Sequence, residues 1–342
     1  MRLLLTTAAL AAIATSAHAE GKLSVYHWFE YIPQELVDKF QKETGIEVTI
    51  DTYDSNEAML ASLKAGKLGQ YDVAVPADFM VGIMAAADGM LDSFTPAEMP
   101  NFGNIAPQWL DVPFDKGRTH SIPYQWGSTS FSVNRDVYPG DISSLGIIFN
   151  PPDELKGKIN VLDSQNEVLI LGSMYLGIPQ CTSDRTQLKA LNDMLLAAKP
   201  YWASFGSDTA KDVLVSGDAA AGMIYNGFSA KARAEGANVE YSYPKEGNVL
   251  WMDNVVLLKD APNRENALKF MNFLLVPENA AAVTNYAAYT SGVTGVEPFL
   301  DDAIKNSPEN NPPADATPGT FAMACDQDTQ KLYDAVWTNL KK

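Results

Sequence analysis

The alternation of strand-like and helix-like segments at the start of the chain constrains its fold most strongly. Residues 23–26, 46–50 and 71–76 show the short apolar or alternating pattern of β-strands. Between them, at residues 33–40 and 55–66, apolar side chains recur at helical spacing. A β-α-β-α-β order of this kind predicts a parallel sheet with helices on both faces. We therefore expect an α/β fold.

Turn and cap residues support the helix boundaries. Pro33 suits the first position of a helix, and Asp54 or Ser55 suits the N-cap of the next. Gly45 and Gly66 stand where the two helices should end. These residues separate the two helices from the strands on either side.

The N-terminus has the pattern of a secretory signal. Arg2 supplies the positive charge, residues 3–13 are apolar, and residues 17–19 (Ala-His-Ala) form an A-x-A cleavage site. The apolar run is too short to span a bilayer, and no later run reaches the roughly 20 residues that a membrane helix needs. We expect residues 1–19 to be removed and the mature protein, beginning near Glu20, to be soluble in a bacterial periplasm.

The remainder of the chain repeats the α/β pattern after a long strand. Residues 122–134 look like one strand that leaves the first lobe. Further strands are expected at residues 159–163, 219–225 and 255–258, helices from near Ser164, at 192–198 and at 331–337, and a loop at 306–318. Removing 19 residues from 342 leaves 323, which is long for one core and suits two lobes.

The composition is acidic, with 42 Asp and Glu against 25 Lys and Arg and a net charge of −17, or −18 without Arg2. Such a charge argues against nucleic acids and anionic membranes as partners, because both bind basic surfaces. It also attracts cations at long range. An acidic surface that merely keeps the protein soluble would have the same composition.

Residues for hydrolytic, metal or phosphate chemistry are scarce. Only His27 and His120 remain after the signal, and the chain has no H-E-x-x-H, C-x-x-C or G-x-S-x-G motif. Residues 217–222 resemble a phosphate loop, but Met223 stands in place of its Lys. We therefore predict no metal, no cofactor and no enzymatic activity. An enzyme that uses carboxylates alone, such as a glycosidase, stays open.

The two cysteines, Cys181 and Cys325, allow one disulfide. In an oxidising compartment such a bond would close a loop of more than 140 residues and stabilise the fold. The sequence does not show whether the two Cα atoms lie within bonding distance. A disulfide and two separately buried thiols therefore both remain open.

Two short segments more than 200 residues apart place aromatic rings beside a carboxylate. They are residues 28–31 (Trp-Phe-Glu-Tyr) and residues 251–253 (Trp-Met-Asp). An aromatic face attracts an organic cation by roughly 0.5–2 kcal/mol, and a carboxylate accepts its N–H donors. The first segment follows a predicted strand, the second precedes one, and residues 77–79 follow another, so all three suit a cleft at strand ends. We predict a binding cleft for an amine, although either segment alone would also suit core packing.

Seven blocks of sequence, spread over nearly the whole mature chain, give it a resemblance to a known family. They are residues 25–31 (VYHWFEY), 40–45 (FQKETG), 53–57 (YDSNE), 75–76 (VP), 122–127 (IPYQWG), 243–247 (YPKEG) with 251–253 (WMD), and 272–275 (NFLL). In their order and spacing they resemble the periplasmic polyamine-binding proteins of bacterial ABC transporters, the spermidine- and putrescine-binding group.

The resemblance implies a two-lobed periplasmic-binding-protein fold of type II that closes on its ligand like a hinged clamp. Each lobe would be a mostly parallel sheet flanked by helices. Residues 20–128 with about 255–297 would form the N-terminal lobe, and about 129–254 with 298–342 the C-terminal lobe. The protein would deliver a small cationic amine to an inner-membrane ABC permease. Since the sequence gives no sign of an oligomer, we expect a monomer.

The resemblance also implies ligand-binding residues from both lobes and from the hinge side. They are Trp28, Glu30, Tyr31 and Phe79 from the first lobe, Glu167 and Tyr225 from the second, and Trp251, Asp253 and Tyr289 from the hinge side. Glu30, Glu167 and Asp253 could match three nitrogens of a triamine, or two of them could hold a diamine. The alternative roles are a helix cap for Glu30, a helix-dipole contact for Glu167 and core packing for Phe79, Tyr225 and Tyr289.

Three positions depart from the family pattern. Ser164 and Phe228 stand where spermidine and putrescine binders, respectively, have an aspartate, and Phe29 replaces a small hydroxyl residue. Asp78, where the family has an uncharged residue, could compensate for the missing carboxylate. The ligand is therefore either a polyamine or a modified or singly charged amine, such as an acylated polyamine, an amino acid derivative or an opine-like conjugate.

Overall fold

The computed structural model describes residues 21–86 and 89–342. The secretory signal predicted at residues 1–19 lies outside the described residues. Within the described part of the chain, no helix is both long and apolar enough to cross a membrane.

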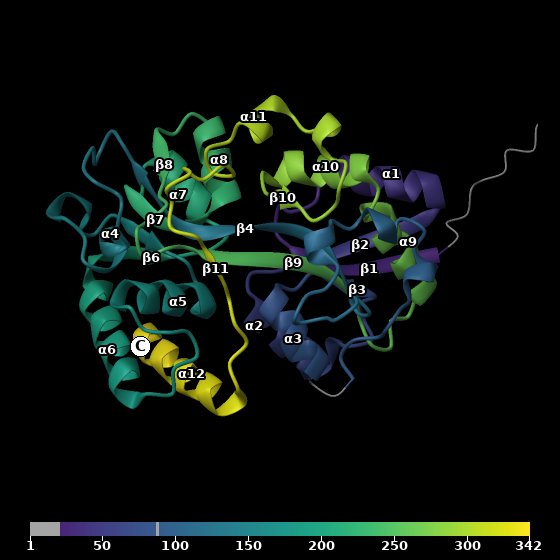
Figure 1. The fold of residues 1–342 in the computed structure, drawn as a ribbon, viewed down its shortest axis with the longest axis horizontal. Coiled ribbons are helices and arrows are strands. Elements are labelled where there is room, and N and C mark those ends of the chain that lie inside the picture. Colours follow the sequence, from purple (N-terminus) through teal and green to yellow (C-terminus); the bar gives the residue numbers. More distant parts are fainter. Residues whose placement is uncertain (1–20, 87–88) are drawn as a thin grey trace, which may run out of the picture.

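Strands and helices alternate along most of the chain (Figure 1). The strands are β1 (Gly21–Trp28), β2 (Ile46–Tyr53), β3 (Val73–Ala74), β4 (Ser121–Asn134), β5 (Ile159–Val161), β6 (Trp202–Phe205), β7 (Ala221–Tyr225), β8 (Val239–Tyr241), β9 (Val249–Leu257), β10 (Thr290–Ser291) and β11 (Thr320–Phe321). The helices are α1 (Gln34–Thr44), α2 (Asn56–Ser62), α3 (Asp78–Ala86), α4 (Gly146–Phe149), α5 (Gln165–Leu176), α6 (Arg185–Ala198), α7 (Ala210–Ser216), α8 (Asn226–Ala234), α9 (Arg264–Leu274), α10 (Pro277–Ala287), α11 (Asp302–Lys305) and α12 (Gln327–Lys341).

Two parallel groups of strands are joined through a long antiparallel pair. The paired strands follow the order β2-β1-β3-β9-β4-β7-β5-β6. β1 pairs in parallel with β2 and β3, and β5 pairs in parallel with β6 and β7. The antiparallel strands β4 and β9 run from one group to the other (Figure 1). The molecule therefore has two halves, each built on a parallel group and each reached by both long strands.

Aromatic packing fixes helix α1 in the first half. Phe40 of α1 is fully buried, and its ring centroid lies 5.2 Å from that of Phe270 and 5.2 Å from that of Phe273, both in α9. Gly45 ends α1 with φ 69°, a left-handed conformation that favours glycine. The predicted end of this helix is therefore confirmed, and the chain turns there into β2.

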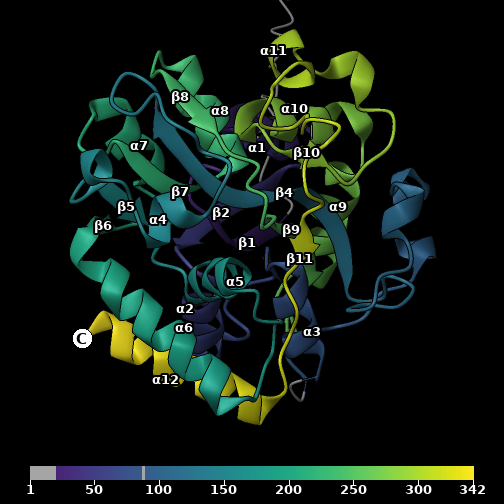
Figure 2. The ribbon, with the colours of Figure 1, turned by 60° about the vertical axis from the view of Figure 1, so that its left-hand side comes forward.

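Helices α6 and α12 lie side by side on the second half (Figure 2). Trp337 of α12 packs edge-on against Phe205 of β6, with ring centroids 6.3 Å apart. The structure joins Cys181, in the segment between α5 and α6, to Cys325, just before α12, with 5.2 Å between their Cα atoms. The disulfide therefore holds the C-terminal helix on the second half.

The predicted boundaries of the second helix need a correction. Ser55 is the N-cap, and its Oγ accepts a hydrogen bond from the Ala58 amide at 3.2 Å. The α-helix ends at Ser62 and a π-helical turn, Leu63–Lys67, follows. Gly66 lies inside that turn with φ 108°, so it marks a kink beyond the helix and not the helix end itself.

Two strand predictions were wrong in extent, and four strands, β6, β8, β10 and β11, were missed. The strand expected at residues 71–76 is reduced to the two residues of β3. Pro76, two residues beyond its end, has no backbone N–H to donate to a neighbouring strand. The strand expected at residues 255–258 begins at Val249, because β4 pairs with the whole stretch, so residues 251–253 lie inside β9 and do not precede it. Strand β6 was not predicted, because its four residues show no regular alternation.

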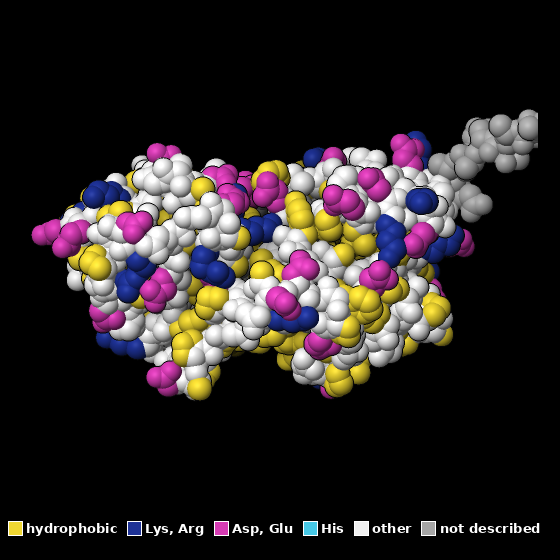
Figure 3. Space-filling view, turned by 90° about the horizontal axis from the view of Figure 1, so that it is seen from above, with side chains coloured by type: hydrophobic (Ala, Val, Ile, Leu, Met, Phe, Trp, Pro, Cys, Tyr) yellow, Lys and Arg dark blue, Asp and Glu magenta, His cyan; other side chains and the backbone are white. Residues whose placement is uncertain are grey.

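The surface carries charges of both signs. Figure 3 shows Asp and Glu side chains on both halves of the face viewed, interspersed with Lys and Arg. The acidic excess of the sequence is therefore spread over this face and does not form one separate patch there.

Candidate ligand-binding site

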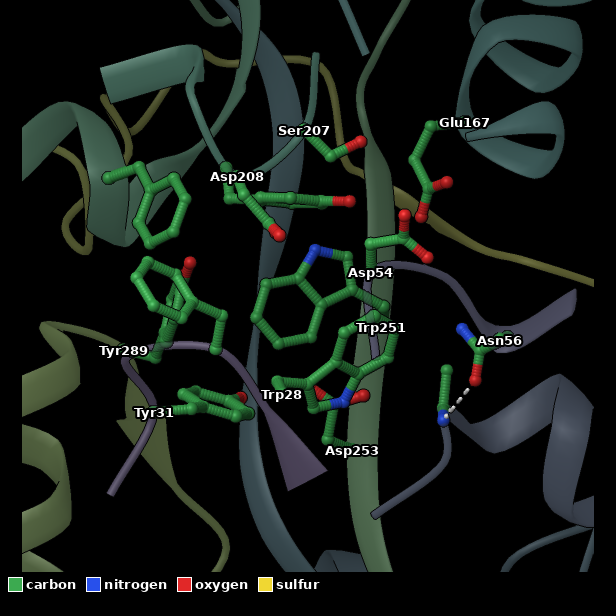
Figure 4. A pocket seen from close by; sticks show the side chains of 14 residues that line it. Trp28, Tyr31, Asp54, Asn56, Glu167, Ser207, Asp208, Trp251, Asp253 and Tyr289 are labelled. Carbon is green, nitrogen blue, oxygen red and sulfur yellow. Dashed lines mark hydrogen bonds between the residues drawn. The ribbon is translucent and has the colours of Figure 1, made fainter. Parts of the chain in front are cut away.

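A cavity with about 590 Å³ of empty space, part of it open to solvent, lies between the two halves. Its lining is Trp28, Phe29, Tyr31, Asp54, Asn56, Ala77, Glu167, Ser207, Asp208, Tyr225, Phe228, Trp251, Asp253 and Tyr289 (Figure 4). Among these described residues four are Asp or Glu and none is Lys, Arg or His. The cavity is therefore aromatic and anionic.

Most of the lining residues stand at the carboxyl ends of parallel strands. Trp28 ends β1, Asp54 follows β2, Asp208 follows β6 and Tyr225 ends β7. In parallel sheets the loops at this edge leave room for a ligand. Because the strands come from both halves, the two edges face each other across the cavity.

The remaining wall comes from the interior of β9. Trp251 and Asp253 are two residues apart in this strand, so their side chains project from the same face. Met252 projects from the other face, where its Sδ lies 3.3 Å from Nη2 of the buried Arg118. Asp253 pairs with Gln125 of β4 and bridges to the backbone of Ala77. The backbone of Asp253 is therefore paired on both sides, which fixes the position from which its carboxylate projects.

Four rings meet edge to face around the cavity. The centroid of Trp251 lies 4.9 Å from that of Tyr289, with planes at 79°, and 6.0 Å from that of Tyr225, with planes at 89°. Tyr31 meets Tyr289 at 5.4 Å and 86°. The Trp251 Nε1 donates to Thr129 Oγ1 at 3.1 Å, which fixes the orientation of the indole. Perpendicular contacts of this kind hold aromatic side chains rigidly and leave ring faces free for an alkyl chain.

Trp28 forms a second rigid wall. Its Nε1 donates to the carbonyl oxygen of Val75 at 2.7 Å, and its ring centroid lies 4.5 Å from that of Tyr53. The Tyr53 hydroxyl donates to the same carbonyl at 2.6 Å. Both side chains are thus anchored to the backbone just before the loop that contributes Ala77.

Asp253 is a buried carboxylate without a positively charged partner. Its side chain is among the rings, the residue is 6% exposed, and no ion pair within the described chain includes it. Burial raises the pKa of Asp253 well above its usual value; the Tyr31 hydroxyl opposes that change, and the nearby charges of Asp78 and Glu167 raise the pKa further. A desolvated carboxylate of this kind is costly unless a cation meets it.

Glu167 stands on the second half, in the first turn of α5. Its Oε2 accepts a hydrogen bond from the Oγ of Ser164. By the family resemblance, Ser164 replaces an aspartate of the spermidine binders. Burial raises the pKa of Glu167, although the Ser164 hydroxyl opposes that change. Ser164 thus adds a hydroxyl donor to the Glu167 carboxylate in place of a second negative charge.

Two further carboxylates lie close to Glu167 outside the lining. Burial raises the pKa of Asp78 to about 7, with the charge of Glu167 contributing, and the same two causes raise the pKa of Glu57 to about 7. Asp78 is 3% exposed, and its Oδ1 accepts from the Phe79 amide at 2.9 Å. The region behind the cavity therefore gathers carboxyl groups in a poorly solvated place, which favours their protonated forms.

The structure brings together seven of the ten residues proposed for the site. Trp28, Tyr31, Glu167, Tyr225, Trp251, Asp253 and Tyr289 line the cavity. The other three lie elsewhere. Glu30 is exposed beyond the end of β1, Asp78 is buried behind the cavity, and Phe79 faces a separate cavity between α3 and α5.

Four polar lining residues were missed. Asp54 directly follows β2 and Asn56 begins α2, and Asn56 Oδ1 accepts from the Ala77 amide at 3.0 Å (Figure 4). The strand-end rule that selected residues 28–31 would have found both. Ser207 and Asp208 follow β6, so they could not be found without predicting that strand.

Two of the three departures from the family pattern also line the cavity. Phe29 and Phe228 place apolar rings there, and Phe228 lies with its centroid 6.0 Å from that of Tyr225. Phe29 is 47% exposed, whereas Phe228 is buried at 8% exposure. One side of the cavity is consequently more apolar than the side that carries Asp253 and Glu167.

Comparisons with known proteins show which family the chain resembles. The family model described as bacterial extracellular solute-binding protein matches residues 35–312. A spermidine/putrescine-binding periplasmic protein of Escherichia coli (strain K12) is 36% identical over 317 residues, covering 92% of this chain and 90% of that protein. The putrescine-binding periplasmic protein SpuD of Pseudomonas aeruginosa (strain UCBPP-PA14) is 34% identical over 357 residues, covering 99% and 97%.

A solved structure extends the likeness to the fold. The spermidine/putrescine ABC transporter substrate-binding protein PotD from Streptococcus pneumoniae is 29% identical and superposes with a TM-score of 0.76, covering 94% of this chain and 99% of that chain. The predicted two-lobed α/β fold and the family resemblance are thereby confirmed. The chain belongs to the family of bacterial extracellular solute-binding proteins.

Proposed function

We propose that this chain is the solute-binding component of an ABC importer and that it binds a polyamine of the putrescine and spermidine class. The observation that carries the proposal is Asp253, a buried carboxylate set among Tyr31, Trp251 and Tyr289 with no cationic partner in the described chain. A protonated amine would supply the missing charge, and its methylene groups would lie against the ring faces. The names of the relatives, which are polyamine-binding proteins, support the same ligand class.

Binding would close the two halves on the ligand. We place the N-terminal lobe at residues 20–128 with about 255–297 and the C-terminal lobe at about 129–254 with 298–342. The strands β4 and β9, which run through both halves, would then act as the hinge. A ligand held by Asp253 on one side and Glu167 on the other favours the closed form, because only that form lets both carboxylates meet it.

The protein would act in transport without making or breaking a bond. After removal of residues 1–19 it would be a periplasmic monomer, and the closed, loaded form would be the one that an inner-membrane permease recognises. The carboxylates of the cavity would serve binding alone, so we propose no enzymatic activity.

A second candidate ligand is a modified or singly charged amine, such as an acylated polyamine, an amino acid derivative or an opine-like conjugate. Phe29 and Phe228 favour it, because they put apolar rings in the cavity where the polyamine binders have a hydroxyl and a carboxylate. An acyl group would suit that apolar side, while a single ammonium group met Asp253.

Isothermal titration calorimetry tests the proposal. The mature protein would be unfolded and refolded to remove any bound ligand, then titrated with putrescine, cadaverine, spermidine, spermine and acetylputrescine. Submicromolar binding of an unmodified polyamine is the expected result. Binding of acetylputrescine alone would favour the second candidate. If circular dichroism shows that the protein is folded and none of the five amines gives a heat of binding, amine binding is contradicted. The fold assignment would still stand.

A further inference from the structure

We propose that Asp54 and Asp208 form an additional position for a protonated nitrogen, between the two halves of the molecule, and that this position makes the cavity select amines with three or more positive charges over diamines. The inference rests on the proposed function, since it concerns the same cavity. It adds two residues that the resemblance to polyamine binders did not supply.

The two carboxylates come from opposite halves and line one cavity. Asp54 directly follows β2, in the first half, and Asp208 lies between β6 and α7, in the second. Figure 4 shows both among the side chains that surround the Trp251 indole. Both residues are exposed, unlike Asp253 and Glu167, so they mark the solvent side of the cavity.

Neither carboxylate has a partner within the described chain. No hydrogen bond or ion pair among residues 21–86 and 89–342 involves the side chain of Asp54 or Asp208. Partial burial raises the pKa of Asp208, and the charges of Asp54 and Glu30 raise it further. Because both aspartates line one cavity, their like charges oppose each other when no cation is present there.

An unpartnered hydroxyl beside the pair points independently to a ligand. Ser207 lines the same cavity, is 6% exposed, and its Oγ has no hydrogen-bond partner in the described chain. Buried hydroxyls are nearly always hydrogen-bonded in folded proteins, so an unpaired hydroxyl in a residue that lines a cavity suggests a partner from outside the chain. A primary ammonium group has three N–H donors, which match Asp54, Asp208 and Ser207 in number.

Other occupants fit the position less well. Within the described residues, no three carboxylate, His or Cys side chains are grouped so that they could hold a metal ion. Lys231 of α8 has its Nζ over the ring of Tyr286 at 4.6 Å and over that of Phe228 at 5.8 Å, and it forms no ion pair with either aspartate. Burial lowers the pKa of Lys231, although the charge of Glu30 opposes that change. An ammonium group of the ligand is therefore the occupant that the chemistry favours.

The positions of Asp54 and Asp208 link the number of charges on the ligand to closure of the two halves. Because each aspartate belongs to a different half, their repulsion opposes closure of the empty protein, and a cation between them removes that opposition. A diamine would use its two charges on Asp253 and Glu167 and leave the pair uncompensated. A triamine would have one ammonium group left to bridge it.

Titration calorimetry of Asp54→Asn and Asp208→Asn with putrescine and with spermidine tests the inference. Each substitution should raise the Kd for spermidine at least tenfold and change the Kd for putrescine less than threefold. The double variant should be little weaker than either single one, since one ammonium group contacts both residues. Glu43→Gln, which removes an exposed carboxylate of α1 outside the cavity, is the matched control and should change neither value.

The outcomes separate this inference from the proposed function. If spermidine binds the two variants as tightly as the unaltered protein, or if both amines lose affinity by the same factor, the bridging position is wrong while amine binding stands. If the unaltered protein binds neither amine, the proposed function fails and this inference fails with it. Circular dichroism and thermal melts of each variant exclude unfolding as the cause of a lost signal.

Discussion

The indole of Trp251 rests directly on the backbone of Gly127. The two residues are paired across strands β9 and β4, and a Cβ atom added to Gly127 would lie 2.8 Å from Cζ2 and 2.9 Å from Cη2 of the indole. Such an atom would also lie 2.5 Å from Oδ1 of Asn226, which accepts a hydrogen bond from the Ser128 amide. Because Gly127 has no side chain, the Trp251 ring can pack against the β4 backbone, and this contact determines the position of the ring in the cavity.

Replacing Gly127 by alanine should therefore displace the ring. We expect Gly127→Ala to lower the free energy of unfolding by about 1–3 kcal/mol, as overpacking usually does, and to weaken polyamine binding at least tenfold. Urea denaturation and titration calorimetry measure the two effects. Gly103→Ala is the control, because a Cβ there meets nothing within 4 Å and its backbone needs no glycine. Unchanged binding by Gly127→Ala would show that the ring position does not control affinity.

The pH dependence of stability should follow the buried carboxylates. Burial and the charge of Glu167 raise the pKa of Asp78, and of Glu57, to about 7, whereas both groups titrate near pH 4 in an unfolded chain. Between about pH 4 and pH 7 the folded protein consequently binds more protons than the unfolded one. Its stability without ligand should fall as the pH rises through this window, by an amount on the order of a few kcal/mol.

Thermal melts of the ligand-free protein between pH 4.5 and pH 8 test this. The melting temperature should fall with rising pH, and Asp78→Asn should make the fall smaller because one of the raised groups is gone. Asp315→Asn, which changes an exposed loop residue, should melt with the slope of the unaltered protein. Equal slopes for Asp78→Asn and the unaltered protein would argue against a protonated Asp78 in the folded state.

The disulfide should affect stability and not binding. Cys181 and Cys325 are 144 positions apart, so their bond restricts the unfolded chain strongly, and replacing both by serine should cost about 2–5 kcal/mol. Neither residue lines the ligand cavity, so the Kd for a polyamine should stay within threefold. Guanidinium denaturation with and without reductant, beside calorimetry, measures both quantities. A denaturation midpoint that reductant leaves unchanged would contradict the stabilising role.

Features carried by local sequence could be predicted. The helical spacing that ends at Gly45 marked α1, and the pairing of a ring with a carboxylate selected Trp28, Trp251 and Asp253, all of which line the cavity. These signals work because cap preferences and the affinity of rings and carboxylates for a cation depend on residues close in the chain. The family resemblance then supplied Tyr289, which has no such local signal.

Features set by tertiary pairing could not be predicted in this way. Asp208 was missed because β6 is recognisable only from its pairing with β5. Glu30 was predicted to line the cleft because it stands between aromatic residues that do. It instead adopts φ 49° at the turn after β1 and is exposed outside the cavity. The contact between Gly127 and Trp251 depends on the register of two strands more than 120 residues apart, which nothing in either segment reveals.

The central claim is that the Asp253 carboxylate, framed by aromatic rings, holds a protonated amine. Calorimetric titration of refolded Asp253→Asn with spermidine, beside the unaltered protein, tests it most directly. The substitution keeps the shape of the side chain and removes its charge, so the account predicts submicromolar binding by the unaltered protein and at least tenfold weaker binding by the variant, with the same circular dichroism spectrum. Equal affinity of the two proteins for spermidine would contradict the account.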